Sequence, residues 1–167
     1  MTTCQAITLD YEDEMKNTRK LLELVPLDET KRGYKPHAKS MSLDRLATHV
    51  AEMPGWLKIA LDREVLEMPL DFKPRIAAST TELLEIFAKG VEEGRAAIAG
   101  ATDAEMRKDW TFKFGDKFSF TQPRTKVIRD VINHVVHHRA QLGVYLRLNE
   151  IAIPGMYGPS ADEAVFG

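Results

Sequence analysis

The chain has 167 residues, of which 44% are hydrophobic and 29% are charged, and its formal net charge is −2. This length and composition predict one folded, soluble domain over residues 1–167 and exclude a disordered chain. The sequence has no long basic block, so we expect no nucleic acid partner.

The sequence also lacks the marks of a membrane or secreted protein. It contains no run of about eighteen apolar residues, and the N-terminal stretch has no basic region followed by an apolar core. The one cysteine, Cys4, excludes an internal disulfide and suits a reducing compartment. We therefore expect a cytoplasmic protein with no membrane association.

The first half of the chain predicts two amphipathic helices. The first covers about residues 9–25 and ends at Pro26. The second begins after Ser42, a good N-cap, and its apolar face extends to about Leu61. Pro54 interrupts this second helix and predicts a bend one turn past His49.

A third helix is predicted from the capping box Ser79-x-x-Glu82 to about Gly100, followed by a polar turn over residues 102–108. Residues 109–121 differ, because aromatic and polar residues alternate on both sides of Gly115-Asp116. This period of two indicates a small hairpin. A lone hairpin is marginally stable, so we interpret it as an aromatic flap over the helices.

The last predicted helix spans residues 124–150, RTKVIRDVINHVVHHRAQLGVYLRLNE, and Pro123 suits its start. Its apolar residues recur at helical spacing. Four amphipathic helices with short to medium connections predict an all-α fold, a four-helix bundle with a small aromatic hairpin or loop before the last helix.

Three histidines are predicted to point into this bundle. On the last helix, His134 and His138 lie one turn apart on the apolar face, whereas His137 points about 100° away, towards solvent. His49 lies on the apolar face of the second helix. Buried imidazoles need partners for their ring nitrogens. Either neighbouring side chains satisfy them, or His49, His134 and His138 together bind a divalent metal ion.

Three neutral imidazoles would leave such an ion with its full charge and an open coordination position, which is the catalytic pattern. Zinc, nickel, cobalt and iron all accept imidazole. Val135 follows His134, so the HExxH pattern with its built-in base is absent. Asp130 and Gln141 flank the pair and could orient its imidazoles, although we favour the interpretation that both are solvated. No catalytic residue is identifiable.

The sequence resembles the DinB-like (damage-inducible) superfamily of four-helix-bundle proteins. The resemblance rests on LATHVAEMPGW around His49, on the HxxxHRxQ run of His134, His138, Arg139 and Gln141, and on PGMYGPSADE near the end. It implies that the three histidines bind a divalent metal, commonly nickel or zinc. Some members of the superfamily are thiol-dependent S-transferases, and related bundles include a mycothiol-dependent isomerase.

These features favour a metal-dependent enzyme in which the ion activates a low-molecular-weight thiol for attack on an electrophilic small-molecule substrate. Two alternatives stay open. One is a hydrolase that uses metal-bound hydroxide, and the other is a bundle that binds metal or partners without turnover. A homodimer is also expected, because bundles of this size often cover an apolar face in that way.

Overall fold

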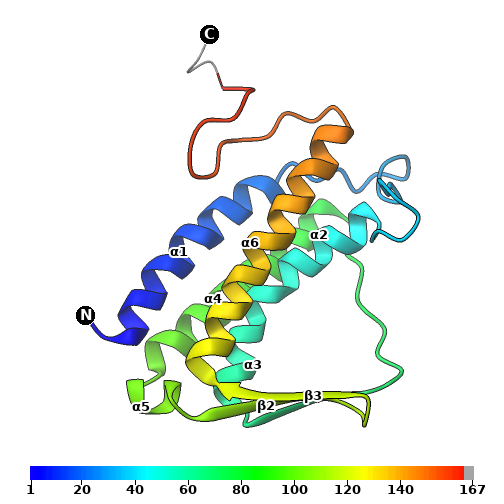
Figure 1. The fold of residues 1–167 in the computed structure, drawn as a ribbon. Coiled ribbons are helices and arrows are strands. Elements are labelled where there is room, and N and C mark those ends of the chain that lie inside the picture. Colours follow the sequence, from blue (N-terminus) through cyan, green and yellow to red (C-terminus); the bar gives the residue numbers. More distant parts are fainter. Residues whose placement is uncertain (164–167) are drawn as a thin grey trace.

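The computed structural model describes residues 1–163, which form a helical bundle with a small sheet at one end (Figure 1). The bundle consists of α1 (Thr3–Leu22), a broken helix, α4 (Thr80–Gly100) and α6 (Arg124–Leu148). The broken helix comprises α2 (Leu43–Glu52), the 3-10 turn η1 (Met53–Gly55) and α3 (Trp56–Asp62). The short helix α5 (Asp103–Met106) occupies the predicted polar turn. The end of the predicted domain, residues 164–167, lies outside the described part.

The helices begin where side chains satisfy the free backbone N–H groups of the first turn. The Thr2 hydroxyl accepts from the Gln5 N–H at 3.2 Å, and the Gln5 side chain accepts from the Thr2 N–H at 2.9 Å. This capping box starts α1 six residues before the predicted Leu9, which is a correction to its boundary. Ser79 caps α4 as predicted, since its hydroxyl accepts from the Glu82 N–H at 3.1 Å.

The predicted bend at Pro54 is present, because η1 separates α2 from α3. Two glycines of α4 allow this bend to lie directly on the bundle. A Cβ at Gly90 would be 3.0 Å from the Gly55 nitrogen, and a Cβ at Gly94 would be 2.7 Å from the Pro54 oxygen. This close approach fixes the position of α2, the helix that carries His49, against α4.

The all-α prediction is wrong in one respect, because a three-stranded sheet accompanies the bundle. The predicted hairpin exists as β2 (Asp109–Phe114) and β3 (Phe118–Pro123), which pair antiparallel. The sequence interpretation missed β1 (Val65–Met68), which pairs parallel to β2. This third strand supplies the pairing that a lone hairpin lacks. Parallel pairing joins segments far apart in the chain, so local periodicity does not reveal it.

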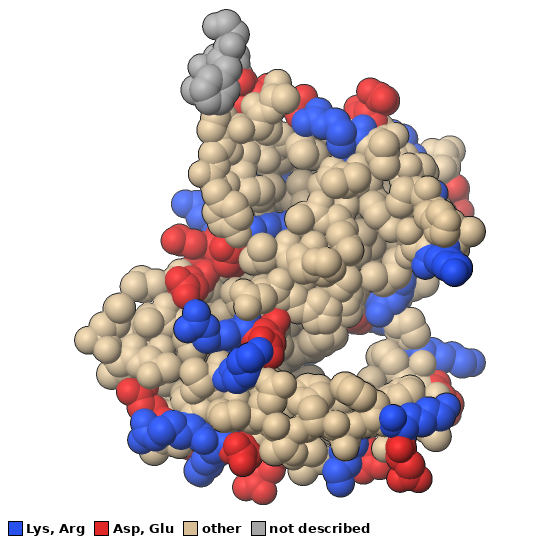
Figure 2. Space-filling model, viewed as in Figure 1, with Lys and Arg blue, Asp and Glu red and all other residues tan. Residues whose placement is uncertain are grey.

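The aromatic residues of the hairpin share one face of the sheet. Phe112 lies opposite Phe120, and their rings stack with centroids 5.7 Å apart. Trp110, on the same face, is buried against the bundle. The molecule is hollowed between the sheet and the bundle, as Figure 2 shows. The connection from β1 to α4, residues 69–79, runs along one side of the molecule in Figure 1, and we call it the strap.

The strap is tied to α2 beside the histidine that α2 carries. The buried Thr48 hydroxyl accepts from the Ala77 N–H at 2.9 Å, and it donates to the Asp44 carbonyl at 2.7 Å. Thr48 is fully buried and immediately precedes His49 in the chain. This hydrogen bond therefore ties the end of the strap to the residue that precedes His49.

A buried arginine joins α6 to α1. The Arg139 guanidinium donates to the Glu14 carbonyl at 3.0 Å and to the Thr18 hydroxyl at 3.2 Å, and it lies 2.7 Å from the Glu14 carboxylate. It also donates to the Tyr157 hydroxyl at 2.7 Å, which holds the C-terminal segment against the bundle. These bonds satisfy the buried charge and fix the rotation of α6. Over residues 1–163, none of the helices has the length and apolar character needed to cross a bilayer.

The close contact at Gly94 predicts a stability change. We expect Gly94→Ala to lower the free energy of unfolding by about 1–3 kcal/mol, since its Cβ would overlap both Pro54 and the Tyr11 hydroxyl. Chemical denaturation measures the change. Gly100→Ala, in the same helix but with open space around it, is the matched control and should be neutral or slightly stabilising. Equal effects of the two substitutions would contradict this account of the bend.

Candidate metal centre

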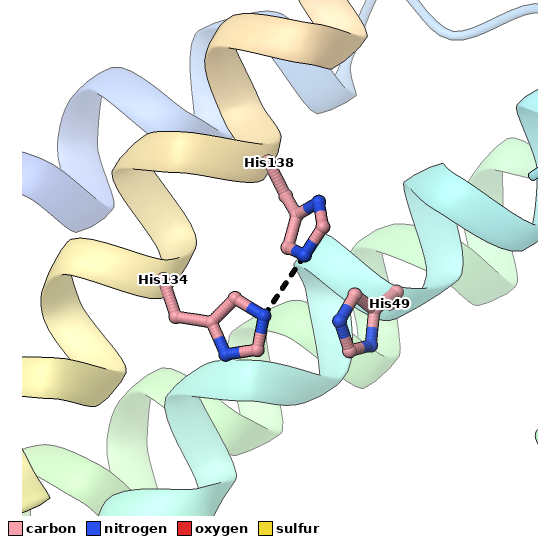
Figure 3. Close-up of side chains that lie close together, drawn as sticks. All are labelled: His49, His134 and His138. Atoms are coloured by element: carbon pink, nitrogen blue, oxygen red, sulfur yellow. Dashed lines mark hydrogen bonds between the residues drawn. The ribbon is translucent and has the colours of Figure 1, made fainter. Parts of the chain in front are cut away.

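The structure brings together the three histidines that the sequence singles out. His49 comes from α2, while His134 and His138 come from consecutive turns of α6 (Figure 3). Each offers one ring nitrogen to a cluster in which these atoms all lie within 4.8 Å of one another. All three side chains are half-buried, so the cluster is partly shielded from solvent by the bundle. His137, as predicted, is exposed.

The hydrogen bonds of His138 define its tautomer. Its Nδ1 lies 2.7 Å from the Gln141 side-chain oxygen, and an amide oxygen can only accept a hydrogen bond. Nδ1 therefore carries the proton, and Nε2 accepts a hydrogen bond from the Nε2 of His134 at 2.8 Å, so both nitrogens point at the same place (Figure 3). A bound metal ion would replace the His134 proton of this bond.

Gln141 thus contacts the site, which is the alternative to the favoured interpretation of a solvated flank. The Gln141 amide also donates to the Nε2 of the exposed His137 at 3.1 Å. A partner of this kind fixes the orientation of a metal-binding imidazole. The i, i+3 spacing of His138 and Gln141 was the available signal. Asp130 instead pairs with Lys126 on the surface and takes no part in the cluster.

One ring nitrogen of His49 is left without a hydrogen-bond partner in the described part of the chain. Its Nδ1 is buried and makes no hydrogen bond to any of residues 1–163. Its ring centroid lies 4.8 Å from that of His138, 5.2 Å from that of His134 and 5.4 Å from that of Trp56. An unpaired buried nitrogen is costly.

The electrostatics keep the three imidazoles neutral. Burial lowers the pKa of His49 to about 4, with further lowering by His138, Arg45 and His134. Burial is also the main cause that lowers the pKa of His134 and of His138. Neutral imidazoles are the form that binds a metal ion.

These observations together fit a divalent ion held by three imidazoles. Each of the three histidines offers a ring nitrogen within 4.8 Å of the other two, and the imidazoles are kept neutral by burial. The donor set suits zinc, nickel, cobalt or iron equally, so it does not choose between nickel and zinc.

Two charged residues beside the histidines were not singled out from the sequence. Arg45 and Glu52 lie on the same face of α2 as His49, at i−4 and i+3. The Arg45 Nη1 atom is 3.7 Å from the Glu52 carboxylate, and burial raises the pKa of Glu52. Their spacing around His49 was the signal in the sequence.

The one cysteine lies elsewhere. Cys4 donates through its sulfur to the Ala101 carbonyl at 3.4 Å, near the start of α1. Burial, with the charge of Asp103, raises the pKa of its thiol. Cys4 is therefore neither a ligand of the cluster nor an activated nucleophile.

The sequence profile of the DinB family matches residues 2–164. The chain belongs to the DinB family. Solved structures agree on the fold, although their sequences are distant. A DinB-like protein from Bacillus cereus ATCC 10987 is 19% identical and has a TM-score of 0.70, over 92% of this chain and 97% of its own. The DinB-like protein YjoA from Bacillus subtilis is 16% identical with a TM-score of 0.66, over 90% and 96%.

YfiT from Bacillus subtilis is a third structural neighbour of this DinB-family chain. It is 13% identical with a TM-score of 0.63, over 89% of each chain, and it is described as a probable metal-dependent hydrolase with an unusual four-helix bundle topology. No curated protein matches the sequence. The resemblance read from the histidine motifs is thus confirmed at the level of family and bundle fold.

The lowered pKa of His49 predicts a pH dependence of stability. Its folded-state pKa of about 4 lies below the ordinary value of 6.5, so between these values the unfolded chain binds more protons. We expect the metal-free protein to lose stability as pH falls from about 6.5 to about 4, measured by denaturation at each pH. His49→Gln should reduce this loss. His37→Gln, at an exposed loop position, should retain the wild-type dependence. An unchanged pH dependence in His49→Gln would show that His49 is not the group responsible.

Proposed function

We propose that this DinB-family protein binds one divalent metal ion through His49, His134 and His138 and transfers a low-molecular-weight thiol to an electrophile. The observation that carries the proposal is the convergence of three half-buried imidazoles, whose ligand nitrogens all lie within 4.8 Å of one another.

The metal would supply the activation of the thiol, because coordination to a divalent cation removes the thiol proton near neutral pH. The protein residues would orient the imidazoles and keep them neutral for metal binding. Gln141 holds His138 with its Nε2 directed at the centre, while burial, to which the charge of Arg45 adds, lowers the pKa of His49 and of His138. In the transfer, the sulfur forms a bond to the electrophilic carbon and the leaving group departs with its electron pair.

The surroundings of the cluster favour a thiol over water as the nucleophile. Among the described residues, the ligand cluster contains histidines and no carboxylate, so no base lies within ligand distance. A thiol, with its ordinary pKa of about 8.5, needs less help to lose its proton than water does. Cys4 lies outside the site, so the thiol would come from a separate small molecule.

Metal-dependent hydrolysis is the second candidate. The description of YfiT as a probable metal-dependent hydrolase motivates it. Glu52 adds a specific reason, because it is a partly buried carboxyl three residues after His49 whose pKa is raised by burial. A carboxyl with a raised pKa suits general acid–base chemistry. Turnover of ester, amide or phosphoester substrates without any thiol would favour this candidate over the first.

The proposed ligand set predicts the metal content of variants. Wild-type protein, purified without a histidine tag, should contain about one divalent ion per chain by elemental analysis. His134→Ala and His138→Ala should contain almost none, because two imidazoles bind far more weakly than three. His137→Ala is the control and should retain its metal, since this exposed side chain lies outside the cluster. Loss of metal in His137→Ala would overturn the assignment.

The interaction of Gln141 with His138 predicts a smaller effect. Gln141→Leu should weaken metal affinity about 10–100-fold, because His138 loses the acceptor that fixes its tautomer. Competition with a chromophoric chelator measures the affinity. An affinity equal to that of the wild type would show that the hydrogen bond plays no part in metal binding.

The proposed reaction is tested with metal-loaded protein, several cellular thiols and 1-chloro-2,4-dinitrobenzene as the electrophile. We expect metal-dependent formation of the thioether with release of chloride, and loss of the reaction in His134→Ala. An absence of metal-dependent conjugation with every thiol would exclude the transferase version of the proposal.

A further inference from the structure

Arg45 extends along α2 past the histidine cluster. Its Nη1 atom lies 3.7 Å from a carboxylate oxygen of Glu52, seven residues further on. Seven residues of α-helix span about 10 Å, so the two side chains must reach towards each other to come so close. His49 lies between them on the same face of the helix. The guanidinium and the carboxyl therefore meet beside His49.

The Arg45 side chain is largely buried, with 19% of its surface exposed. Burial is the main cause that lowers the pKa of His49 and of His138, and the charge of Arg45 adds to this lowering at both imidazoles.

The hydrogen bonding of Arg45 is incomplete. Its Nη1 atom is buried and donates to no acceptor within residues 1–163, and the 3.7 Å to Glu52 exceeds a hydrogen bond. Arg139 shows the contrast, since its guanidinium donates to three oxygens besides its ion pair. A largely desolvated charge without good acceptors is costly unless a ligand supplies them.

We propose that Arg45 binds a carboxylate of the small molecule that docks at the three histidines. A guanidinium can bind a carboxylate through two parallel N–H···O bonds, while the thiol of the same molecule reaches the cluster. The proposal rests on the proposed function and narrows its thiol partner to an anionic thiol. The opposing reading is that Arg45 serves only as the structural partner of Glu52.

The test compares two thiols that differ in charge. Mercaptoacetate carries a carboxylate, and 2-mercaptoethanol carries a neutral hydroxyl in its place. Each is titrated into cobalt-loaded protein, and the absorption band of the sulfur–metal bond gives its Kd. We expect mercaptoacetate to bind at least about tenfold more tightly, because a charge-assisted hydrogen bond contributes on the order of 1.5 kcal/mol or more.

Three variants separate the roles of the charges. Arg45→Met should remove the advantage of mercaptoacetate and change the Kd of 2-mercaptoethanol less than about twofold. Glu52→Gln should strengthen mercaptoacetate binding, because it removes the carboxylate that competes for Arg45. Arg107→Met, at an exposed position after α5, makes the same change in net charge as Arg45→Met and should behave as the wild type.

Each outcome is decisive. If both thiols bind equally well, or if mercaptoacetate keeps its advantage in Arg45→Met by chelating the metal itself, the inference is overturned while the thiol function stands. If neither thiol gives the band, the thiol function fails and the inference fails with it. Circular dichroism and the thermal midpoint of Arg45→Met check its fold. The tighter binding of mercaptoacetate expected in Glu52→Gln tests the role of Arg45 independently of that variant.

Discussion

The histidine cluster depends on how α2 and α6 pack against the rest of the bundle. The bend after α2 lies on the glycine face of α4, where a side chain as small as a methyl group would collide with backbone. The buried ion pair of Arg139 with α1 holds α6 on the other side. These contacts set the rotation of each helix, so His49 meets His134 and His138 across the contact of α2 with α6. The positions of the three histidines therefore follow from the packing of the helices.

The same burial that positions the imidazoles also prepares them chemically. Removal from water lowers the affinity of each ring for a proton, and the positive charge of Arg45 adds to this effect at His49 and His138. A cation would face the same repulsion from Arg45 that a proton does, which an anionic ligand beside it would relieve. A divalent ion at the histidines and an anion beside the guanidinium would therefore each favour the binding of the other.

Local sequence patterns predicted a large part of this arrangement. Helical periodicity separated His137 from its two neighbours, and Pro54 predicted the bend, because both effects depend on residues within a turn or two of one another. The start of α1 was missed although its signal, Thr2-x-x-Gln5, was present. The strand β1 could not be predicted in this way. Its pairing depends on the packing of segments that are distant in the chain, which periodicity does not encode.

Gln141 gives the centre a means of adjustment that costs the fold nothing. It is exposed on α6, so its replacement removes no core packing, yet its oxygen would influence how strongly His138 donates electrons to an ion bound as proposed. A stronger acceptor at this position would make the imidazole more basic and the ion less acidic, and a weaker one would do the reverse. Members of a family with this helix could thus retain the same three ligands and differ in reactivity through one surface residue. Natural variation at that position is a place where chemistry can diverge while the bundle stays the same.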